Sequence, residues 1–221
     1  MNSPEPLTVE AVLFDFDGTL FDTISLIVES YQYVYKKFKL REHSVEEILS
    51  GIGLPLEEIF AEYPDLQDEL LKEYLRFNHS VTKEHVGIYL GIVPMLEALR
   101  EKEIPLGIVS AKREESLLPT LRQFEAEEYF AVIVSKGDTD KHKPDPEPLL
   151  LAMKKMGLDS PERILYVGDS VFDIQAAHNG GFLSAAVGWS SMPHEALKAE
   201  KPSCWIEKAG DLARLCEKCL E

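Results

Sequence analysis

The sequence predicts an α/β protein, with a parallel sheet that has helices on both faces and an inserted all-helical cap. Five short apolar runs rich in Val and Ile alternate with amphipathic stretches of helical spacing. Fully apolar strands of this kind are typical of a parallel sheet covered on both sides. The alternation breaks once, after the first run, where a long helical segment intervenes. The five expected strands are residues 11–14, 105–109, 130–134, 164–167 and 184–187.

The helical interruption covers residues 23–86, where Leu, Ile, Tyr and Phe recur at helical spacing. The segment Gly51-Ile52-Gly53-Leu54-Pro55 marks a loop inside it. We therefore predict a core domain formed by residues 1–21 and 88–221, and a cap domain formed by residues 22–87. The expected cap helices are residues 23–38, 44–49, 56–63 and 66–85.

The overall composition excludes several classes of partner. With 221 residues, of which 45% are hydrophobic and 28% charged, the chain has the composition of a soluble globular protein. A net charge of −16 opposes nonspecific binding to nucleic acid and to anionic lipid. No apolar run approaches the ~20 residues that a membrane span needs, and no secretion signal is recognisable. We expect a cytoplasmic protein that binds neither nucleic acid nor membrane.

Acidic and hydroxyl side chains follow three of the expected strands at the point where each ends. Asp15 and Asp17 follow the first strand, Ser110 follows the second, and Asp169 follows the fourth, with Asp173 one helical turn later. In an open parallel sheet the ligand lies at the carboxyl ends of the strands. We therefore expect these residues to share one site.

These carboxylates need a partner of opposite charge. Held together they repel one another, and they would also repel a phosphate dianion. A hard divalent cation removes both problems, because Mg²⁺ binds one or two carboxylates together with phosphate oxygens and water. Asp15, Asp169 and Asp173 match this requirement, so the pattern predicts a Mg²⁺ site that holds a small phosphorylated substrate.

A carboxylate can attack a metal-bound phosphate to give an aspartyl-phosphate, which water then hydrolyses. We assign Asp15 as the nucleophile and Asp17 as the acid and base, since side chains two residues apart on a strand point the same way. Lys143, which precedes the fourth strand, is expected to neutralise charge shared by Asp15 and the phosphoryl group. The Ser110 hydroxyl and the backbone N–H groups near Ala111 are expected to bind phosphoryl oxygens.

Each residue also has a purely structural explanation. Aspartates can form turns, serines and aspartates can cap helices, and a loop lysine can simply be solvated. The joint arrangement favours the chemical interpretation, because acidic and hydroxyl residues at the ends of neighbouring strands need a common cause. Asp145 is an exception: it precedes Pro146 and an amphipathic run, so we predict a helix cap there and not a ligand.

Over nearly its whole length the sequence resembles the haloacid dehalogenase superfamily, whose four motifs are present in order. The matching segments are Asp15-Phe16-Asp17-Gly18-Thr19, Ser110 after Gly107-Ile108-Val109, Lys143-Pro144, and Gly168-Asp169-Ser170 with Asp173. The resemblance implies a Rossmann-like core with a helical cap inserted after the first motif. It also implies that Asp15 is both nucleophile and metal ligand, that Asp17 binds metal through its backbone carbonyl, and that Asp169 and Asp173 complete the metal site. Members that remove halide lack an acidic residue equivalent to Asp17, so phosphoryl chemistry is favoured.

Two further segments indicate a branch within the superfamily. Gly51-Ile52-Gly53-Leu54-Pro55-Leu56 is similar to phosphoglycolate phosphatases. Lys143-Pro144-Asp145-Pro146-Glu147-Pro148 and Val187-Gly188-Trp189-Ser190-Ser191 are similar to the pyrophosphatase branch of that group. The resemblance therefore implies hydrolysis of a small phosphate ester or of pyrophosphate.

Two other functions stay open on the sequence. A sugar phosphomutase of the β-phosphoglucomutase type uses the same nucleophile, and measuring isomerisation against phosphate release separates it from a phosphatase. A noncatalytic phosphate-binding protein would be expected to lack a catalytic acid, and none is missing here. For the quaternary state we expect a monomer or a weak homodimer.

Overall fold

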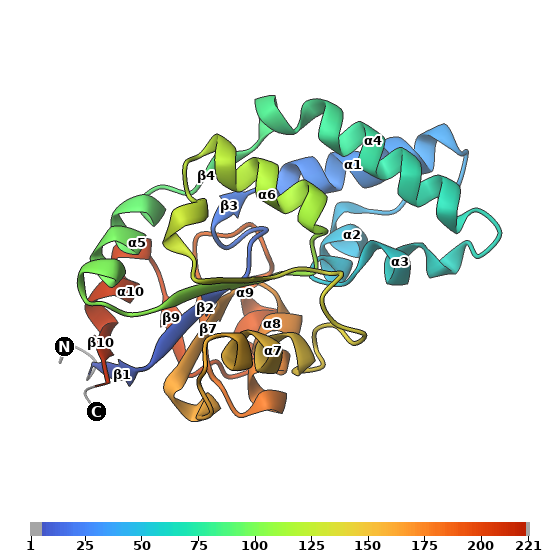
Figure 1. Cartoon of the computed structure of the whole chain (residues 1–221). Helices are drawn as coiled ribbons and strands as arrows, with labels where there is room; N and C mark the ends of the chain where they lie inside the picture. The colour runs from blue at the N-terminus through green and yellow to red at the C-terminus, as the bar shows by residue number, and fades with distance from the viewer. Residues whose placement is uncertain (1–5, 220–221) are drawn as a thin grey trace.

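The structure is a computed structural model that describes residues 6–219, apart from the side chains of residues 83 and 84. The first five residues of the predicted core domain lie outside this range, as do residues 220 and 221. A six-stranded sheet forms the centre of the molecule (Figure 1), and every neighbouring pair of its strands is parallel. Across the sheet the strands are β6 (Val132–Val134), β5 (Leu106–Val109), β2 (Ala11–Phe14), β7 (Ile164–Gly168), β8 (Leu183–Val187) and β9 (Cys204–Ile206).

Helices cover both faces of this sheet because successive strand residues point to opposite sides. On β2, Val12 and Phe14 pack into one cluster of buried side chains, and Ala11 and Leu13 pack into another. The first cluster lies under α5 (Ile92–Glu101), α6 (Glu114–Gln123) and α10 (Ala209–Leu215). The second lies under α7 (Glu147–Lys155) and α8 (Val171–Gly180). The prediction of a parallel sheet with helices on both faces is confirmed.

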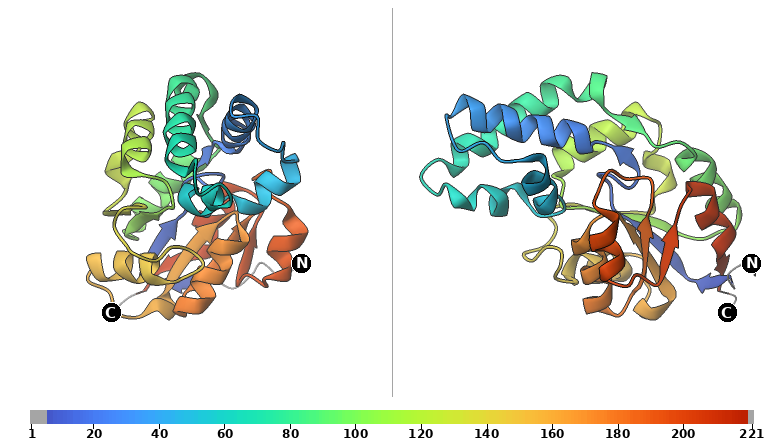
Figure 2. Two further views of the ribbon diagram at one scale, coloured as in Figure 1. Left: turned by 90° about the vertical axis from the view of Figure 1, so that its right-hand side faces the viewer. Right: turned by 180° about the vertical axis from the view of Figure 1, so that it is seen from behind.

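A group of helices stands apart from the sheet, on the side where the strands end (Figures 1 and 2). Its long members, α1 and α4, pack against each other through a cluster that includes Tyr31, Tyr35 and Tyr74. The chain enters and leaves this group through two short antiparallel strands, which pair Asp22 with Gly87. The elements are β3 (Phe21–Asp22), α1 (Ile24–Lys37), α2 (Val45–Gly51), α3 (Leu56–Ile59), η1 (Phe60–Glu62), α4 (Gln67–His85) and β4 (Gly87–Ile88).

The four predicted cap helices correspond to α1, α2, α3 with η1, and α4. The capping box between Ser44 and Glu47 explains why α2 begins where the sequence predicted, since both side chains satisfy backbone N–H groups of its first turn. The division into domains at residues 22 and 87 stays a prediction, and we call residues 22–87 the cap.

Several short elements were missing from the prediction. Strands of two or three residues are too short to show an alternating pattern, and edge strand β9 carries only three residues. The additional elements are β1 (Leu7–Val9), which pairs with β10 (Cys216–Lys218), together with η2 (Glu127–Tyr129), η3 (Pro161–Arg163) and α9 (His194–Ala199).

Within the described part of the chain, none of the helices combines the length and the apolar character that a membrane span requires.

Candidate active site

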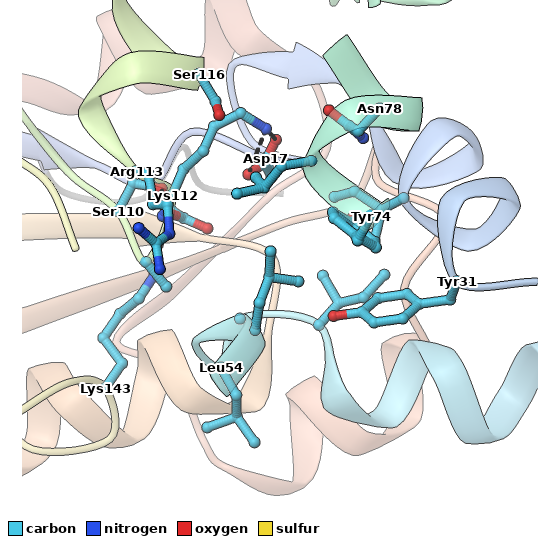
Figure 3. A pocket seen from close by; sticks show the side chains of 17 residues that line it. Asp17, Tyr31, Leu54, Tyr74, Asn78, Ser110, Lys112, Arg113, Ser116 and Lys143 are labelled. Carbon is cyan, nitrogen blue, oxygen red and sulfur yellow. Dashed lines mark hydrogen bonds and ion pairs between the residues drawn. The ribbon is translucent and has the colours of Figure 1, made fainter. Parts of the chain in front are cut away.

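A cavity of about 80 Å³ lies between the carboxyl ends of the strands and the cap. Five of the seven predicted site residues line it: Asp15, Asp17, Ser110, Ala111 and Lys143. In Figure 3, Ser110, Lys112 and Lys143 occupy one side of this cavity, and Tyr31 and Tyr74 of the cap face them. The other two predicted residues, Asp169 and Asp173, lie beside Asp15, where one carboxylate oxygen from each of the three falls within 4.8 Å of the others.

The chain turns sharply after β2, and this turn presents the first two aspartates. We expected the strand to continue through Asp17, but β2 ends at Phe14, and the Asp15 amide donates to the Val167 carbonyl at 2.8 Å. Both carboxylates nevertheless reach the cavity. Gly18 makes the turn possible, because its φ is +76° and an added Cβ would lie 1.9 Å from Asp169 Oδ2. A side chain at this position would displace the carboxylate.

The three clustered carboxylates are all buried, and for Asp15 and Asp169 burial disfavours the ionised form. Burial raises the pKa of Asp15 to about 7, with Lys143 opposing the rise, and burial also raises the pKa of Asp169 well above its usual range. Asp15 Oδ1 is buried with no hydrogen-bond donor aligned on it. A cluster of carboxylate oxygens, one of which accepts no aligned hydrogen bond, fits a hard cation, so these residues can hold a metal ion.

Lys143 is buried among acceptors. Its Nζ lies 2.6 Å from Asp173 Oδ1, 3.0 Å from Asp15 Oδ1 and 3.1 Å from the Tyr166 hydroxyl. The contact with Asp15 is an ion pair without the alignment of a hydrogen bond. Burial alone would lower the pKa of Lys143, but the two carboxylates raise it above its ordinary value, so the lysine stays charged. The site therefore keeps a fixed positive charge next to Asp15.

Asp173 connects this lysine to the start of α8. Its Oδ2 accepts hydrogen bonds from the Ser170 amide at 2.9 Å and from the Ser170 hydroxyl at 2.6 Å, which forms a capping box. Its Oδ1 contacts Lys143 and Tyr166. Both oxygens are thus engaged within the protein, and Asp173 supports the site through Lys143. Its predicted contact with metal stays a prediction.

Lys112 is a site residue that the sequence interpretation missed. Its Nζ lies 2.8 and 3.2 Å from the two oxygens of Asp17 (Figure 3), and its amide donates to the Ser110 hydroxyl at 3.2 Å. Both Lys112 and Arg113 line the cavity. Their position directly after Ser110, at the carboxyl end of β5, was the available signal.

Two further missed residues orient the predicted ones. The Ser190 hydroxyl donates to Asp169 Oδ2 at 2.6 Å, and the Tyr166 hydroxyl lies 2.9 Å from the Val109 carbonyl while it contacts Lys143. Ser190 lies in the segment 187–191 that resembles the pyrophosphatase branch, but its contact with Asp169 arises only through the tertiary fold. Asp145 was expected to be the N-cap of α7, but that position is Pro146; Asp145 lies one residue earlier, and its Oδ1 accepts a hydrogen bond from the amide of Glu147, the first residue of the helix, at 3.0 Å.

The cap is tied to the core beside the cavity. Glu57 of α3 pairs with Arg113 and lies 3.4 Å from Lys136 Nζ. His79 of α4 lies 2.6 Å from the Ser116 hydroxyl of α6. These contacts hold the cap over the carboxyl ends of the strands, and the cavity is closed on that side by cap side chains.

Comparison with known proteins agrees with this geometry. A family profile described as haloacid dehalogenase-like hydrolase matches residues 12–187. The chain is 37% identical over 206 residues to pyrophosphatase PpaX of Bacillus pumilus, an alignment that covers 93% of this chain and 95% of the relative. It is also 37% identical over 217 residues to a protein of Caldanaerobacter subterraneus provisionally named pyrophosphatase PpaX, which covers 97% of this chain and 98% of the relative.

Solved structures show the same fold. A protein of Lactobacillus plantarum, provisionally named a phosphoglycolate phosphatase, superposes with a TM-score of 0.85 at 28% identity, covering 95% of this chain and 100% of the other. A protein of Bacteroides fragilis, provisionally named a haloacid dehalogenase-like hydrolase, superposes with a TM-score of 0.85 at 28% identity, covering 93% of this chain and 100% of the other. The whole arrangement of sheet and helical insertion is therefore shared with these proteins.

Proposed function

This chain belongs to the haloacid dehalogenase-like hydrolase family and is a phosphatase of that kind, and on this premise we propose its mechanism and its class of substrate. We propose that it hydrolyses a small phosphate ester or pyrophosphate through a phosphorylated Asp15, with Mg²⁺ as cofactor. The observation that carries the proposal is Asp15 itself. Its buried carboxylate faces a cavity that Asp17 also lines, and a fixed ammonium group lies 3.0 Å away.

In the first step an oxygen of Asp15 forms a bond to phosphorus, and the bond from phosphorus to the leaving oxygen breaks. Asp17 lines the same cavity and donates a proton to that leaving oxygen. Lys143 stays charged and offsets the negative charge that builds up between Asp15 and the phosphoryl group. Ser110 and the amide of Ala111 bind the phosphoryl oxygens.

In the second step the acid becomes the base. Asp17 takes a proton from a water molecule that attacks phosphorus, which releases phosphate and returns Asp15 to its free form. In the free protein Lys112 holds Asp17. The acid step therefore requires Asp17 to exchange this ion pair for a contact with substrate.

The metal belongs beside these residues. Asp15 and Asp169, together with the backbone carbonyl of Asp17, would hold Mg²⁺, with Asp173 supporting them. When bound, the metal neutralises the carboxylates and the phosphoryl oxygens, so that an anionic nucleophile can approach an anionic substrate.

The test is phosphate release by the Asp15→Asn variant in the presence of Mg²⁺. Turnover should fall by a factor of about 1,000 or more, because an amide cannot form the phosphorylated intermediate. The matched control is Asp65→Asn, an exposed cap position outside the cavity, which should retain full activity. Unchanged turnover in Asp15→Asn would sink the proposal.

A panel of pyrophosphate, 2-phosphoglycolate and hexose phosphates identifies the substrate. A phosphomutase would convert a sugar phosphate into its isomer without releasing equivalent phosphate, so both products should be measured. We propose phosphatase activity because relatives that share more than a third of this sequence are named pyrophosphatases. The cytoplasmic location and the monomeric or weakly dimeric state belong to the same proposal, and ultracentrifugation tests the latter.

A further inference from the structure

The two sides of the cavity differ in chemistry. The core contributes carboxylates, hydroxyls and three cationic side chains, Lys112, Arg113 and Lys143. The cap contributes mostly apolar side chains, and among the described residues it adds no charged group to the lining. Its lining residues are Ile27, Tyr31, Ile52, Gly53, Leu54, Leu56, Tyr74, Leu75 and Asn78. Only three of these carry a polar side chain, so recognition by the cap depends on a few atoms.

Two of the three polar side chains are already occupied. Asn78 Nδ2 donates to the Ser30 hydroxyl at 3.1 Å, and its Oδ1 lies 3.4 Å from the Thr82 hydroxyl. The Tyr74 hydroxyl also interacts with Ser30. Both residues lie on α4, and both side chains are engaged by Ser30 of α1.

Tyr31 is different. It is only 4% exposed, and its ring packs against Tyr74, Phe60 and Tyr35 at centroid distances of 4.8, 5.5 and 6.1 Å. Its hydroxyl reaches into the cavity (Figure 3), and no described residue forms a hydrogen bond with it. Burial raises the pKa of Tyr31, so the hydroxyl stays neutral and keeps its proton to donate. The hydroxyl is open to the cavity, where a ligand atom can accept a hydrogen bond from it.

We propose that the Tyr31 hydroxyl forms a hydrogen bond with the leaving group of the substrate. The enzyme would then favour compounds whose leaving group carries an oxygen that can accept this bond. This inference rests on the proposed function. Tyr31 of α1 lines the cavity from the cap, while Asp15 lines it from the end of β2 in the core, so the leaving group is the part of the substrate within reach of Tyr31. The rigid aromatic packing fixes the hydroxyl in place, which is what selection between similar molecules requires.

A matched pair of substrates tests this. 2-Phosphoglycolate and ethyl phosphate have the same phosphate ester, but only the former has a carboxylate in place of the terminal methyl group. The Tyr31→Phe variant should lose about tenfold in kcat/KM for 2-phosphoglycolate or pyrophosphate, whichever the wild type hydrolyses, mainly through KM. For ethyl phosphate, Tyr31→Phe should leave kcat/KM unchanged if the compound is a substrate, or the inhibition constant unchanged if it is a competitive inhibitor.

Tyr35→Phe is the control, because Tyr35 lies on the same helix with the same 4% exposure but does not line this cavity. Tyr35→Phe should leave kcat/KM for the oxygen-bearing compound, and the constant measured for ethyl phosphate, at their wild-type values. An equal loss for the oxygen-bearing compound and for ethyl phosphate, or no loss for either, overturns the inference.

A binding measurement separates this inference from the proposed function. Calorimetric titration of 2-phosphoglycolate and of pyrophosphate into Asp15→Asn protein, with and without Tyr31→Phe, reports recognition without turnover. About tenfold weaker binding of at least one compound in the double variant supports the role of Tyr31 even if phosphate release is never observed. Equal binding contradicts it even if the wild type is an active phosphatase.

Discussion

Lys143 and Tyr166 illustrate how this site fixes a buried charge. An ammonium group has three N–H donors, and Asp15, Asp173 and Tyr166 surround this one at hydrogen-bonding distance. The Tyr166 hydroxyl lies in turn 2.9 Å from the Val109 carbonyl at the end of β5. The position of the lysine therefore depends on β2, β7 and α8 together, and the loss of any one contact would change how Lys143 lies beside the Asp15 carboxylate.

Tyr166→Phe should destabilise the protein by about 1–3 kcal/mol, because it leaves a donor on Lys143 and the Val109 carbonyl buried without a partner. It should also lower kcat, since Lys143 is then less firmly held beside Asp15. Urea denaturation and steady-state kinetics measure the two effects. The control Tyr129→Phe, at a partly exposed tyrosine away from the site, should change stability by less than about 0.5 kcal/mol. A Tyr166→Phe protein with wild-type stability would contradict the role described for this hydroxyl.

Ser190→Ala should weaken Mg²⁺ binding about 10- to 100-fold, because the Ser190 hydroxyl orients Asp169 at 2.6 Å. Calorimetric titration of Mg²⁺ and the Mg²⁺ dependence of activity both report the change. Ser191→Ala removes the same group from the exposed neighbouring position and should leave Mg²⁺ affinity unaltered. Equal affinities of the two variants would show that Ser190 does not position Asp169.

At the level of elements, contacts of α3 and of the 51–55 loop with the core help to hold the cap over the cavity. Glu57 faces two cations, Arg113 and Lys136. Gly53, with φ of +106°, lies so close to α8 that an added Cβ would stand 2.8 Å from the Ser170 hydroxyl. The loop therefore reaches the core only because this residue has no side chain.

Glu57→Gln should increase the open fraction of the cap about two- to fivefold, because partly exposed ion pairs of this kind contribute about 0.5–1 kcal/mol. Distances between spin labels on α4 and α7 report the opening. Glu58→Gln is the control, since Glu58 is exposed and forms no ion pair with any described residue. The effect should shrink at high salt, which screens the wild-type pairs. If Glu57→Gln and Glu58→Gln open the cap equally, the ion pairs do not hold it.

At the level of the whole molecule, the carboxylate cluster couples folding to pH and metal. The folded protein raises the pKa of Asp15 from 3.8 to about 7, chiefly by burial. The raised pKa of Asp15 therefore adds to the free energy of unfolding at low pH. This contribution is complete below pH 3.8 and is lost as the pH rises through about 7. Without metal, this part of the molecule therefore loses stability across that range. A cation favours the ionised carboxylates and acts in the opposite direction.

The increase in Tm caused by Mg²⁺ should accordingly be larger at pH 8 than at pH 5. At pH 5 the metal must displace the proton of Asp15, whose pKa is about 7, and at pH 8 this carboxylate is mostly ionised. Differential scanning calorimetry at both pH values, with Mg²⁺ and with a chelator, measures the difference. Asp15→Asn should reduce the dependence on pH. An equal or larger Mg²⁺ effect at pH 5 would contradict this account.

The sequence was sufficient for five of the six strands of the sheet and for the residues that directly follow three of them. The strand beginning at Ala11 is apolar on both faces, and parallel topology then brings Asp15, Ser110 and Asp169 to one edge. The contacts of Lys112, Ser190 and Tyr31 were not predictable, because each pairs with a residue or a cavity far away in the sequence. The same holds for β3 and β4, whose two residues each become strands only by pairing.

That pairing makes the cap a module that can be exchanged. Opposed residues of antiparallel strands lie about 5 Å apart, so the ends of the insertion at Asp22 and Gly87 are close enough for a two-residue turn to join them. Recombination at this point can replace one cap by another without changing the path of the core chain. New selectivity can thus be introduced by exchanging the cap while the site at the strand ends is kept.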